Sequence, residues 1–369
     1  MVVPAISNPN PCTGSSLCGG AASNIILVQA DNVTINRLVL DGDNPGLTSG
    51  ISRGGADLDA RNGIITNHAL NTPFNNLTVS NVTVKNIYLR GIYASSGGTF
   101  NFHDNTVMNV QGDSSSIGIF NFEGAGVMAH NEVSYANDAI SSNWSTGVKF
   151  LDNEVTHSGS GVHTDNAGAY GGTADLIQGN EIKHCMTDGY GIFVFAPYIA
   201  PTVDDNEIEG CAVGLAAFGQ GLLMTSPVTI QFTDNAVNGK HALTSDPSGT
   251  LGVLVSTDLL GWGSTDVSVS FTKNVIERFS TGVYVEQQCE LFGSWFPTDC
   301  ASPTQATAVL HNNIIKGNNT GANGLIGTTV DAENNWWGCK KGPNQPGCDT
   351  AIGTVDFTPW LTKPPKLDH

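Results

Sequence analysis

Short runs of alternating apolar and polar residues recur along the chain, separated by Gly, Asn, Thr and Ser. Successive side chains of a β-strand point to opposite faces, so these runs predict short strands with one buried face. The composition agrees, because Gly reaches 44 residues and charged residues only 13%, unlike helix-rich chains. No stretch of 18 or more apolar residues occurs, so we expect an all-β protein without a membrane span.

Two sequence marks repeat in register. The first is an Asn followed two residues later by an aliphatic residue or by Thr-Val, at intervals of 22 to 29 residues and twice of 39: Asn81, Asn105, Asn131, Asn153, Asn180, Asn206, Asn235, Asn274 and Asn313. The second is Gly plus an aliphatic residue: Gly91-Ile92, Gly118-Ile119, Gly161-Val162, Gly191-Ile192, Gly214-Leu215, Gly252-Val253 and Gly282-Val283, with Ala139-Ile140 in one coil.

A period of this length predicts a solenoid in which each repeat is one coil. Like positions of neighbouring coils then stack ~4.8 Å apart, and Asn residues in register, Asn81 included, can form a hydrogen-bonded ladder. An earlier coil is expected at Asn32, which gives about ten coils in all. We therefore predict a solenoid over residues 24–335, an N-terminal extension or cap over 1–23, and a C-terminal cap and tail over 336–369, where Trp336, Trp337 and Trp360 close the core.

The chain is strongly acidic, with 15 Lys and Arg against 33 Asp and Glu and a net charge of −18. Nucleic acid is excluded as an expected partner, because phosphate binding needs a basic surface. A polyanionic glycan would be repelled unless a cation or a local basic patch offset the charge. A neutral glycan meets no such penalty, although an acidic surface also serves solubility alone.

The eight cysteines form near pairs: Cys12 and Cys18, Cys289 and Cys300, Cys339 and Cys348, and the coil-related Cys185 and Cys211. None has the spacing of a metal site. Cys185 and Cys211 each follow a repeat Asn by five residues, so they are expected to stack on adjacent coils within disulfide range. They could equally be reduced core residues. Disulfides indicate a secreted or extracellular protein.

Coils of this Asn-x-Ile and Gly-Ile type resemble the right-handed parallel β-helix superfamily, which includes pectate lyases, alginate epimerases and many glycan hydrolases. The closing segments, Asn334-Asn335-Trp336-Trp337-Gly338 and Val355-Asp356-Phe357-Thr358-Pro359-Trp360-Leu361, are similar to the C-terminal end of many secreted bacterial β-helix proteins. The resemblance covers roughly residues 24–362, implies a single right-handed parallel β-helix, and does not specify the reaction.

Outward side chains of one strand per coil form a continuous face, on which such enzymes usually place their cleft. Counting two and four residues from each Gly mark places an aromatic-rich set outside. Exposed rings with interspersed polar groups suit sugars, although loops could instead cover them in a second small core. The expected substrate-binding residues are Tyr93, Phe120, Asn143, Trp144, Phe193, Phe195, Phe218, Tyr284 and Glu286.

The densest polar group on this face contains His163 and Asp165, with Glu123 two coils earlier. Two coils separate Glu123 from Asp165 by ~9.6 Å, near the upper end of the roughly 6.5–9.5 Å expected for an inverting pair of carboxylates. We expect Asp165, with a pKa raised by neighbouring rings such as Trp144 and Phe195, to donate a proton. Glu123 would activate water, and His163 would orient substrate or share in proton transfer. The alternative is an ordinary polar surface.

Other functions stay open. A polysaccharide lyase needs a base and a cation, and Arg90, Lys149 and Lys183 are the basic residues near the central coils. Ca²⁺ could bind at Asp204-Asp205 or at Asp41 and Asp43. A non-catalytic carbohydrate-binding or adhesin-type β-helix is a further alternative. The protein would be a monomer or a homotrimer of the tailspike kind. Insertions near Trp262 and between Gln287 and Thr304 could wall a groove.

Overall fold

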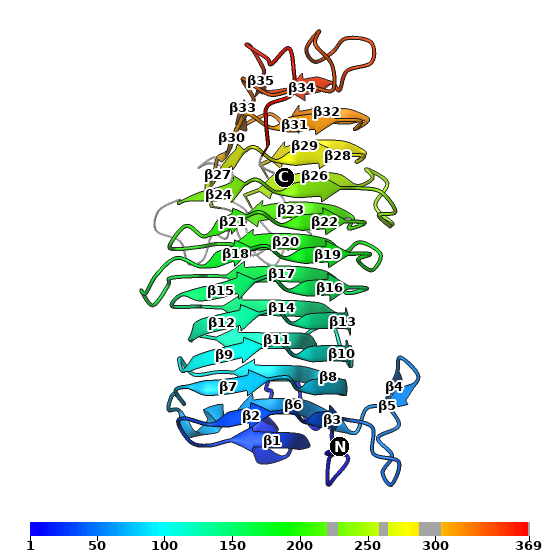
Figure 1. Ribbon diagram of the computed structural model, residues 1–369, viewed down its shortest axis with the longest axis vertical. Helices are drawn as coiled ribbons and strands as arrows, with labels where there is room; N and C mark the ends of the chain where they lie inside the picture. The colour runs from blue at the N-terminus through cyan, green and yellow to red at the C-terminus, as the bar shows by residue number, and fades with distance from the viewer. Residues whose placement is uncertain (220–227, 258–264, 288–303, 368–369) are drawn as a thin grey trace. The chain divides into compact units, whose positions relative to one another are not determined.

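The computed structural model describes residues 1–219, 228–257, 265–287 and 304–367. Its contacts divide the chain into two compact units, Met1–Leu176 and Ile177–His369. Each unit is built from short parallel strands that form three rows (Figure 1). Strand β18 (Leu176–Gln178) spans the division. The loop segments around Trp262 and the expected Cys289–Cys300 pair lie outside the described residues.

In the first unit, each row takes one strand from each coil. The first row is β2 (Thr34–Asn36), β7 (Leu77–Ser80), β9 (Thr99–His103), β12 (Ala125–Ala129) and β15 (Val148–Leu151). The second is β3 (Val39–Asp41), the first half of β8 (Thr83–Ala94), β10 (Thr106–Val110), β13 (Glu132–Ala136) and β16 (Glu154–Thr156). The third is β1 (Asn24–Val28), β6 (Ala60–Thr66), the second half of β8, β11 (Ile117–Phe122), β14 (Asp138–Asn143) and β17 (Ser160–Asp165). Outside the rows are the antiparallel pair β4 (Ser52–Arg53) and β5 (Ala56–Asp57) and the short 3₁₀ helices η1 (Cys18–Gly20) and η2 (His68–Leu70).

The second unit repeats this plan. Its first row is β21 (Thr202–Asp204), β24 (Thr229–Thr233), β27 (Val267–Thr272), β30 (Ala306–His311), β33 (Thr329–Asp331) and β35 (Val355–Asp356). The second row is β19 (Glu181–Lys183), β22 (Glu207–Glu209), β25 (Ala236–Asn238), β28 (Val275–Glu277) and β31 (Ile314–Lys316). The third row is β20 (Tyr190–Phe195), β23 (Val213–Phe218), β26 (Leu251–Ser256), β29 (Thr281–Glu286), β32 (Thr320–Gly324) and β34 (Ala351–Gly353). Among the described residues, no helix is long and apolar enough to cross a lipid bilayer.

The expected Asn ladder is present in both units. In the first, the Asn105 amide nitrogen donates to Asn131 Oδ1 at 2.9 Å, and Asn131 donates to Asn153 Oδ1 at 2.9 Å. In the second, the same bonds link Asn180, Asn206, Asn235, Asn274, Asn313 and Asn335 in turn. These amides are almost fully buried, so each bond satisfies a polar group that water cannot reach.

The ladder role expected of Asn81 is wrong. The register pairs Thr83 with Thr106, which places Val82, not Asn81, level with Asn105. The Val82 N–H donates to Asn105 Oδ1 at 3.1 Å, while Asn81 is exposed and has a φ of 54°. Asn81 is therefore a turn residue, where Asn tolerates the left-handed backbone.

The Gly-aliphatic mark is explained by a close approach between coils. A Cβ on Gly91 would lie 2.3 Å from the Gly118 carbonyl oxygen and 2.8 Å from Val107 Cγ1. A side chain does not fit there, so the second and third strand rows meet at a column of glycines.

Among the described residues, the predicted disulfides are present: Cys12–Cys18, Cys185–Cys211 and Cys339–Cys348. The Cys185 and Cys211 Cα atoms are 4.7 Å apart, which confirms their expected placement on adjacent coils.

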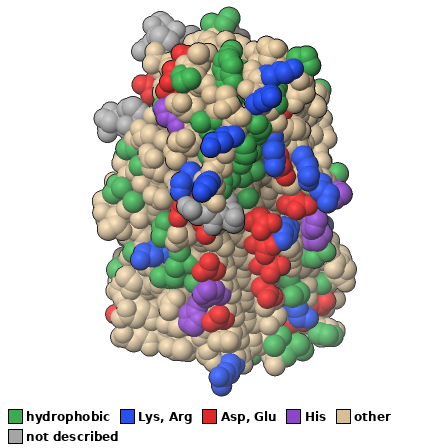
Figure 2. All heavy atoms as spheres, turned by 45° about the horizontal axis from the view of Figure 1, so that its top comes forward, with side chains coloured by type: hydrophobic (Ala, Val, Ile, Leu, Met, Phe, Trp, Pro, Cys, Tyr) green, Lys and Arg blue, Asp and Glu red, His purple; other side chains and the backbone are tan. Residues whose placement is uncertain are grey.

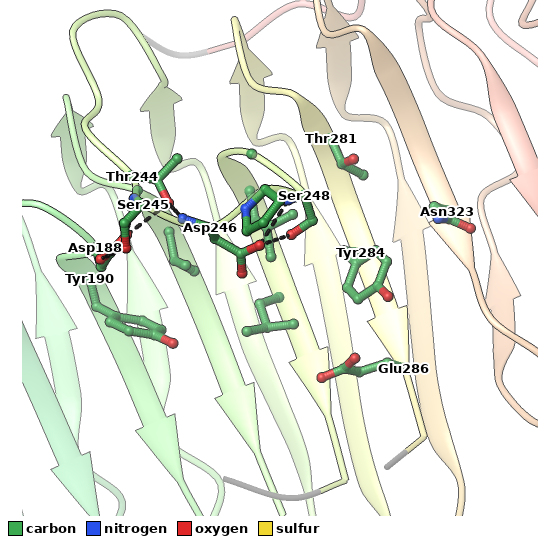
Figure 3. A pocket seen from close by; sticks show the side chains of 16 residues that line it. Asp188, Tyr190, Thr244, Ser245, Asp246, Ser248, Thr281, Tyr284, Glu286 and Asn323 are labelled. Atoms are coloured by element: carbon green, nitrogen blue, oxygen red, sulfur yellow. Dashed lines mark hydrogen bonds between the residues drawn. The ribbon is translucent and has the colours of Figure 1, made fainter. Parts of the chain in front are cut away.

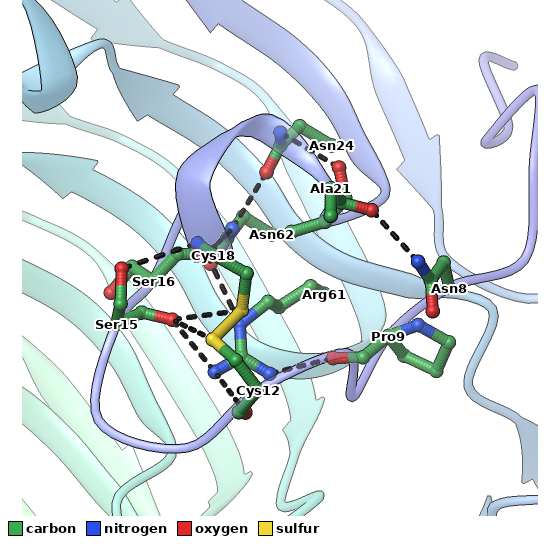
Figure 4. Close-up of a disulfide and its surroundings, with 11 residues drawn as sticks. Asn8, Pro9, Cys12, Ser15, Ser16, Cys18, Ala21, Asn24, Arg61 and Asn62 are labelled. Atoms are coloured by element: carbon green, nitrogen blue, oxygen red, sulfur yellow. Dashed lines mark hydrogen bonds between the residues drawn. A yellow bond between two sulfur atoms is a disulfide. The ribbon is translucent and has the colours of Figure 1, made fainter.

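An N-terminal segment folds against β6 and is held there by a buried arginine (Figure 4). The Arg61 guanidinium donates to the carbonyls of Pro9 at 2.7 Å and Ser15 at 2.8 Å. Leu17 of the same segment packs on Tyr93 and Phe120. This segment therefore covers part of the outward face of the third row.

Of the three tryptophans expected to close the C-terminal core, Trp337 has no exposed surface. Trp336 is half-buried and pairs with Ile314 of β31. The Trp360 ring lies against Gly342, where an added Cβ would be 2.4 Å from the ring. The tryptophans therefore pack at the C-terminal end of the second unit's core.

Candidate functional site

The predicted outward columns are formed within each unit. In the first unit, Tyr93, Phe120, Ser141 and His163 lie in one column, and Phe122, Asn143 and Asp165 in the next. In the second unit, the columns are Phe193, Ala216, Leu254 and Tyr284, and Phe195, Phe218, Ser256 and Glu286. Counting residues from the Gly marks therefore predicted correctly which side chains of successive coils lie in the same column.

Several expected sugar-stacking rings are buried. Tyr93 and Phe120 are 6% and 4% exposed and stack with centroids 4.7 Å apart, beneath Leu17. Phe195 and Phe218 are 4% and 3% exposed in a cluster of the second unit. These four rings offer almost no surface to a ligand. At these positions the structure has the alternative arrangement, in which the outward rings are covered in a second small core.

The remaining expected contact residues keep accessible surface. Asn143 and Trp144 are half-buried in the first unit, and Phe193, Tyr284 and Glu286 are half-buried in the second. Tyr284 and Glu286 line a cleft there.

His163 is the centre of a hydrogen-bond network on β14 and β17. Its Nε2 lies 2.8 Å from Ser141 Oγ, and its Nδ1 lies 3.0 Å from Asp138 Oδ2. Asp138 also accepts a hydrogen bond from the Ser160 hydroxyl. Burial alone would lower the pKa of His163, but the charge of Asp138 and its hydrogen bond raise that pKa above its ordinary value.

The connectivity of these three residues is that of a Ser–His–Asp triad, but Ser141 is not placed as a nucleophile. It has no exposed surface, and its hydroxyl donates to Asn143 Oδ1 at 3.1 Å. Which atom donates in the hydrogen bond between Ser141 Oγ and His163 Nε2 depends on the tautomer and charge of the imidazole ring. Ser141 therefore orients the His163 ring.

Asp165 is the carboxyl with the strongest functional signature in the first unit. Burial raises its pKa from 3.8 to about 6, against the opposing charge of His163. It accepts a hydrogen bond from the Asn166 side chain, and its backbone carbonyl accepts from Trp144 N–H at 2.7 Å. A carboxyl with a pKa of about 6 is half protonated at pH 6, which brings it close to the working range of a general acid.

An aromatic pair with one exposed and one half-buried ring follows the strand positions next to Asp165. Trp144 and Tyr170 stack with ring centroids 5.5 Å apart and planes 26° apart, and Tyr170 is 63% exposed. The segment that carries Tyr170 is anchored by buried Asp175, which accepts from the hydroxyls of Ser145 and Thr164. Rigid rings with one open face suit the apolar face of a sugar.

Glu123 lies in a neighbouring column, not in that of Asp165. It directly follows Phe122, and its N–H donates to the Asn143 carbonyl at 2.9 Å. Its φ of 68° puts it, like Trp144 and Asn166, in the left-handed turn after the strand. Glu123 is thus two coils from Asn166, a rise of about 9.6 Å. Its charge helps to raise the pKa of Tyr93, after burial.

Asp138, Ser160 and Tyr170 were missed from the sequence. Asp138 and Ser160 occupy the outward position just before each Gly mark, so extending the count one step backward would have found them. Tyr170 lies in a segment between coils, where the repeat carries no information.

Basic residues and metal sites bear on the lyase alternative. The Arg90 guanidinium carbon lies 4.9 Å from the Phe120 ring centroid, and its NH1 donates to the Ser115 carbonyl. Asp41 pairs with Lys85 at 2.7 Å. Among the described residues, no group of three or more His, Cys, Asp or Glu is placed to hold a metal ion.

Acidic side chains gather in groups on one face of the surface. On the face drawn in Figure 2, Asp and Glu side chains gather in groups, with Lys, Arg and His side chains beside some of them. Some acids are paired, as Glu277 is with Lys316 at 3.0 Å.

Comparison with known proteins identifies the fold. Residues 62–242 match the family model described as the right-handed β-helix region. No curated protein and no solved structure matches the chain.

Proposed function

Since the chain belongs to the right-handed parallel β-helix family, we propose that it is a secreted enzyme that degrades a polysaccharide, a glycoside hydrolase with paired carboxylates. The observation that carries the proposal is Asp165, a half-buried carboxyl with a pKa of about 6 on the outward face of a β-helix coil. The three disulfides support a location outside the cytosol.

In the proposed reaction, Asp165 donates its proton to the bridging oxygen as the bond from that oxygen to the anomeric carbon breaks. Glu123 takes a proton from a water molecule, and the water oxygen bonds to the same carbon from the opposite face. Inversion of configuration needs the two carboxyl groups roughly 6.5–9.5 Å apart, so both side chains have to lean toward the intervening coil to offset its rise of about 9.6 Å.

His163 has a positioning role in this proposal. Its ring is held between Ser141 and Asp138, so the charge that the ring carries when protonated acts on Asp165 from a constant place. Trp144 and Tyr170 would stack on a sugar ring beside the proton donor.

Hydrolysis is favoured over elimination because the basic residue nearest this face is already engaged. Arg90 lies over Phe120 and is half-buried, and its guanidinium donates to the Ser115 carbonyl, so it is poorly placed to abstract a proton. Non-catalytic binding is the competing function, supported by the same ring pair.

The test is a panel of neutral and acidic polysaccharides, with and without Ca²⁺, treated with wild type and Asp165→Asn. We expect new reducing ends, no unsaturated ends, no need for Ca²⁺, and loss of product in Asp165→Asn but not in the exposed control Asp152→Asn. Unsaturated ends would replace hydrolysis by elimination. Binding without any product would identify a binding module, and size-exclusion mass would separate monomer from homotrimer.

A further inference from the structure

The second unit has a cleft that shares no residue with the Asp165 group. Its volume is about 970 Å³, near the top of the roughly 300–1,000 Å³ range of ligand sites. The third strand row forms its floor, and the segment from Thr244 to Gly249 forms a wall (Figure 3).

The wall is fixed by hydrogen bonds. Asp188 accepts from the Ser245 N–H at 2.6 Å and from the Thr244 hydroxyl at 2.8 Å. Asp246 accepts from the Ser248 N–H at 2.8 Å and hydroxyl at 2.6 Å. The cleft is thus largely preformed, which reduces the entropy lost when a ligand binds.

The floor is aromatic and has a rigid backing. Tyr190 and Tyr284 are half-buried and pack against a cluster that contains Phe218 and Leu254. The Tyr190 and Phe218 ring centroids are 6.2 Å apart. Rings supported in this way present flat apolar faces with little loss of side-chain entropy on binding.

The charge of the cleft has one sign. Asp188, Asp246 and Glu286 line it, and none of its described lining residues is Lys, Arg or His. Burial raises the pKa of Tyr190 and Tyr284, and the charges of Glu286 and Asp246 raise both further. Hydrogen bonds from Ser248 lower the pKa of Asp246. The phenols therefore stay protonated donors and Asp246 stays ionised, so an anionic ligand meets repulsion.

We propose that this cleft binds a neutral saccharide segment, with sugar rings on Tyr190 and Tyr284 and sugar hydroxyls donating to Asp246 and Glu286. The proposal rests on the proposed function only for the expectation of a saccharide, and it adds the charge class and a binding site in the second unit.

Binding is measured by calorimetry on the Asp165→Asn variant, so that hydrolysis cannot consume the ligand. The probes are neutral hexamers of glucose, xylose, mannose and galactose, together with a galacturonate hexamer and its fully methyl-esterified form, which has the same sugar backbone with the charge of each carboxylate removed by a methyl group. We expect at least one neutral probe to bind and the charged hexamer to bind at least tenfold more weakly than its ester.

Two variants test the geometry. Tyr284→Ala should weaken neutral binding tenfold or more, whereas Tyr135→Ala, an exposed tyrosine of the first unit, should leave it within twofold. The double variant Asp246→Asn, Glu286→Gln keeps the shape of the cleft and should bring the charged hexamer within threefold of its ester.

Equal binding of the two galacturonate probes to wild-type cleft residues would overturn the proposal, as would the absence of binding by every neutral probe. Product formation by the wild type with no binding change in Tyr284→Ala would remove the cleft proposal and leave the function at Asp165 standing. Binding of a neutral probe that is weakened by Tyr284→Ala, with no product from the wild type, would keep the cleft proposal and remove the proposed hydrolysis at Asp165.

Discussion

Replacing Asp165 by Asn should stabilise the protein while abolishing the proposed reaction. A carboxyl whose pKa is raised from 3.8 to about 6 binds its proton more tightly in the folded state than in the unfolded chain. The wild type therefore keeps its full stability below pH 4 and loses part of it as the pH rises through 6. Asn has nearly the same shape and cannot ionise, so it avoids this loss.

The size of the effect follows from the pKa shift. Each pKa unit is about 1.4 kcal/mol, so a shift of roughly two units gives an upper bound of about 3 kcal/mol. The shift already includes the opposing attraction of His163, and we expect a gain of about 1–3 kcal/mol.

The assay is urea unfolding from pH 4 to pH 8 of wild type, Asp165→Asn and the exposed control Asp152→Asn. The difference between Asp165→Asn and wild type should be near zero at pH 4, grow up to pH 6 and then stay constant. A difference that does not change with pH, or an Asn variant less stable than wild type at pH 7, would refute the assigned environment of Asp165.

Three further predictions test the ladder, the His163 network and the ring pair. Asn131→Ala should lower the free energy of unfolding in urea by about 2–4 kcal/mol because it leaves buried ladder groups unpaired. The exposed control Asn101→Ala should change that free energy by less than about 0.5 kcal/mol, and equal effects of the two substitutions would contradict the ladder. Ser141→Ala should reduce the turnover of a polysaccharide that the wild type cleaves by less than about tenfold. Loss of a true nucleophile lowers kcat by a factor on the order of 10⁴ or more, and a loss of that size would identify Ser141 as the nucleophile. Tyr170→Ala should raise KM with little change in kcat, because a stacking platform binds ground state and transition state alike; a fall in kcat alone would remove that role.

The coil register could be predicted from the sequence because backbone stacking forces equal positions into columns. The Asn131 mark, the Gly91 mark and the pairing of Cys185 with Cys211 all report the same period, and each is confirmed. The ladder position predicted wrongly is Asn81, which lies one residue before the position that is level with the ladder. The error arose because Asn is favoured both in buried ladders and in left-handed turns.

Side-chain exposure could not be predicted in the same way. Periodicity shows that Tyr93 and Phe120 point outward, but not that Leu17, more than 70 residues away in sequence, packs over them. Tyr170 was missed for the converse reason, because it lies between coils and is brought to Trp144 by a segment anchored at Asp175. Long-range packing, not strand alternation, decides which outward residues remain available.

The most direct test of the proposed proton donor is the pKa of Asp165 itself. Carboxyl carbons of Asp, labelled with ¹³C, would be titrated by NMR in wild type and in Asp165→Asn. The account predicts a resonance in the wild type that titrates at about pH 6 and is missing in the variant. If the resonance lost in Asp165→Asn titrates near the ordinary value of 3.8, Asp165 is an ordinary surface carboxylate and cannot be the acid proposed here.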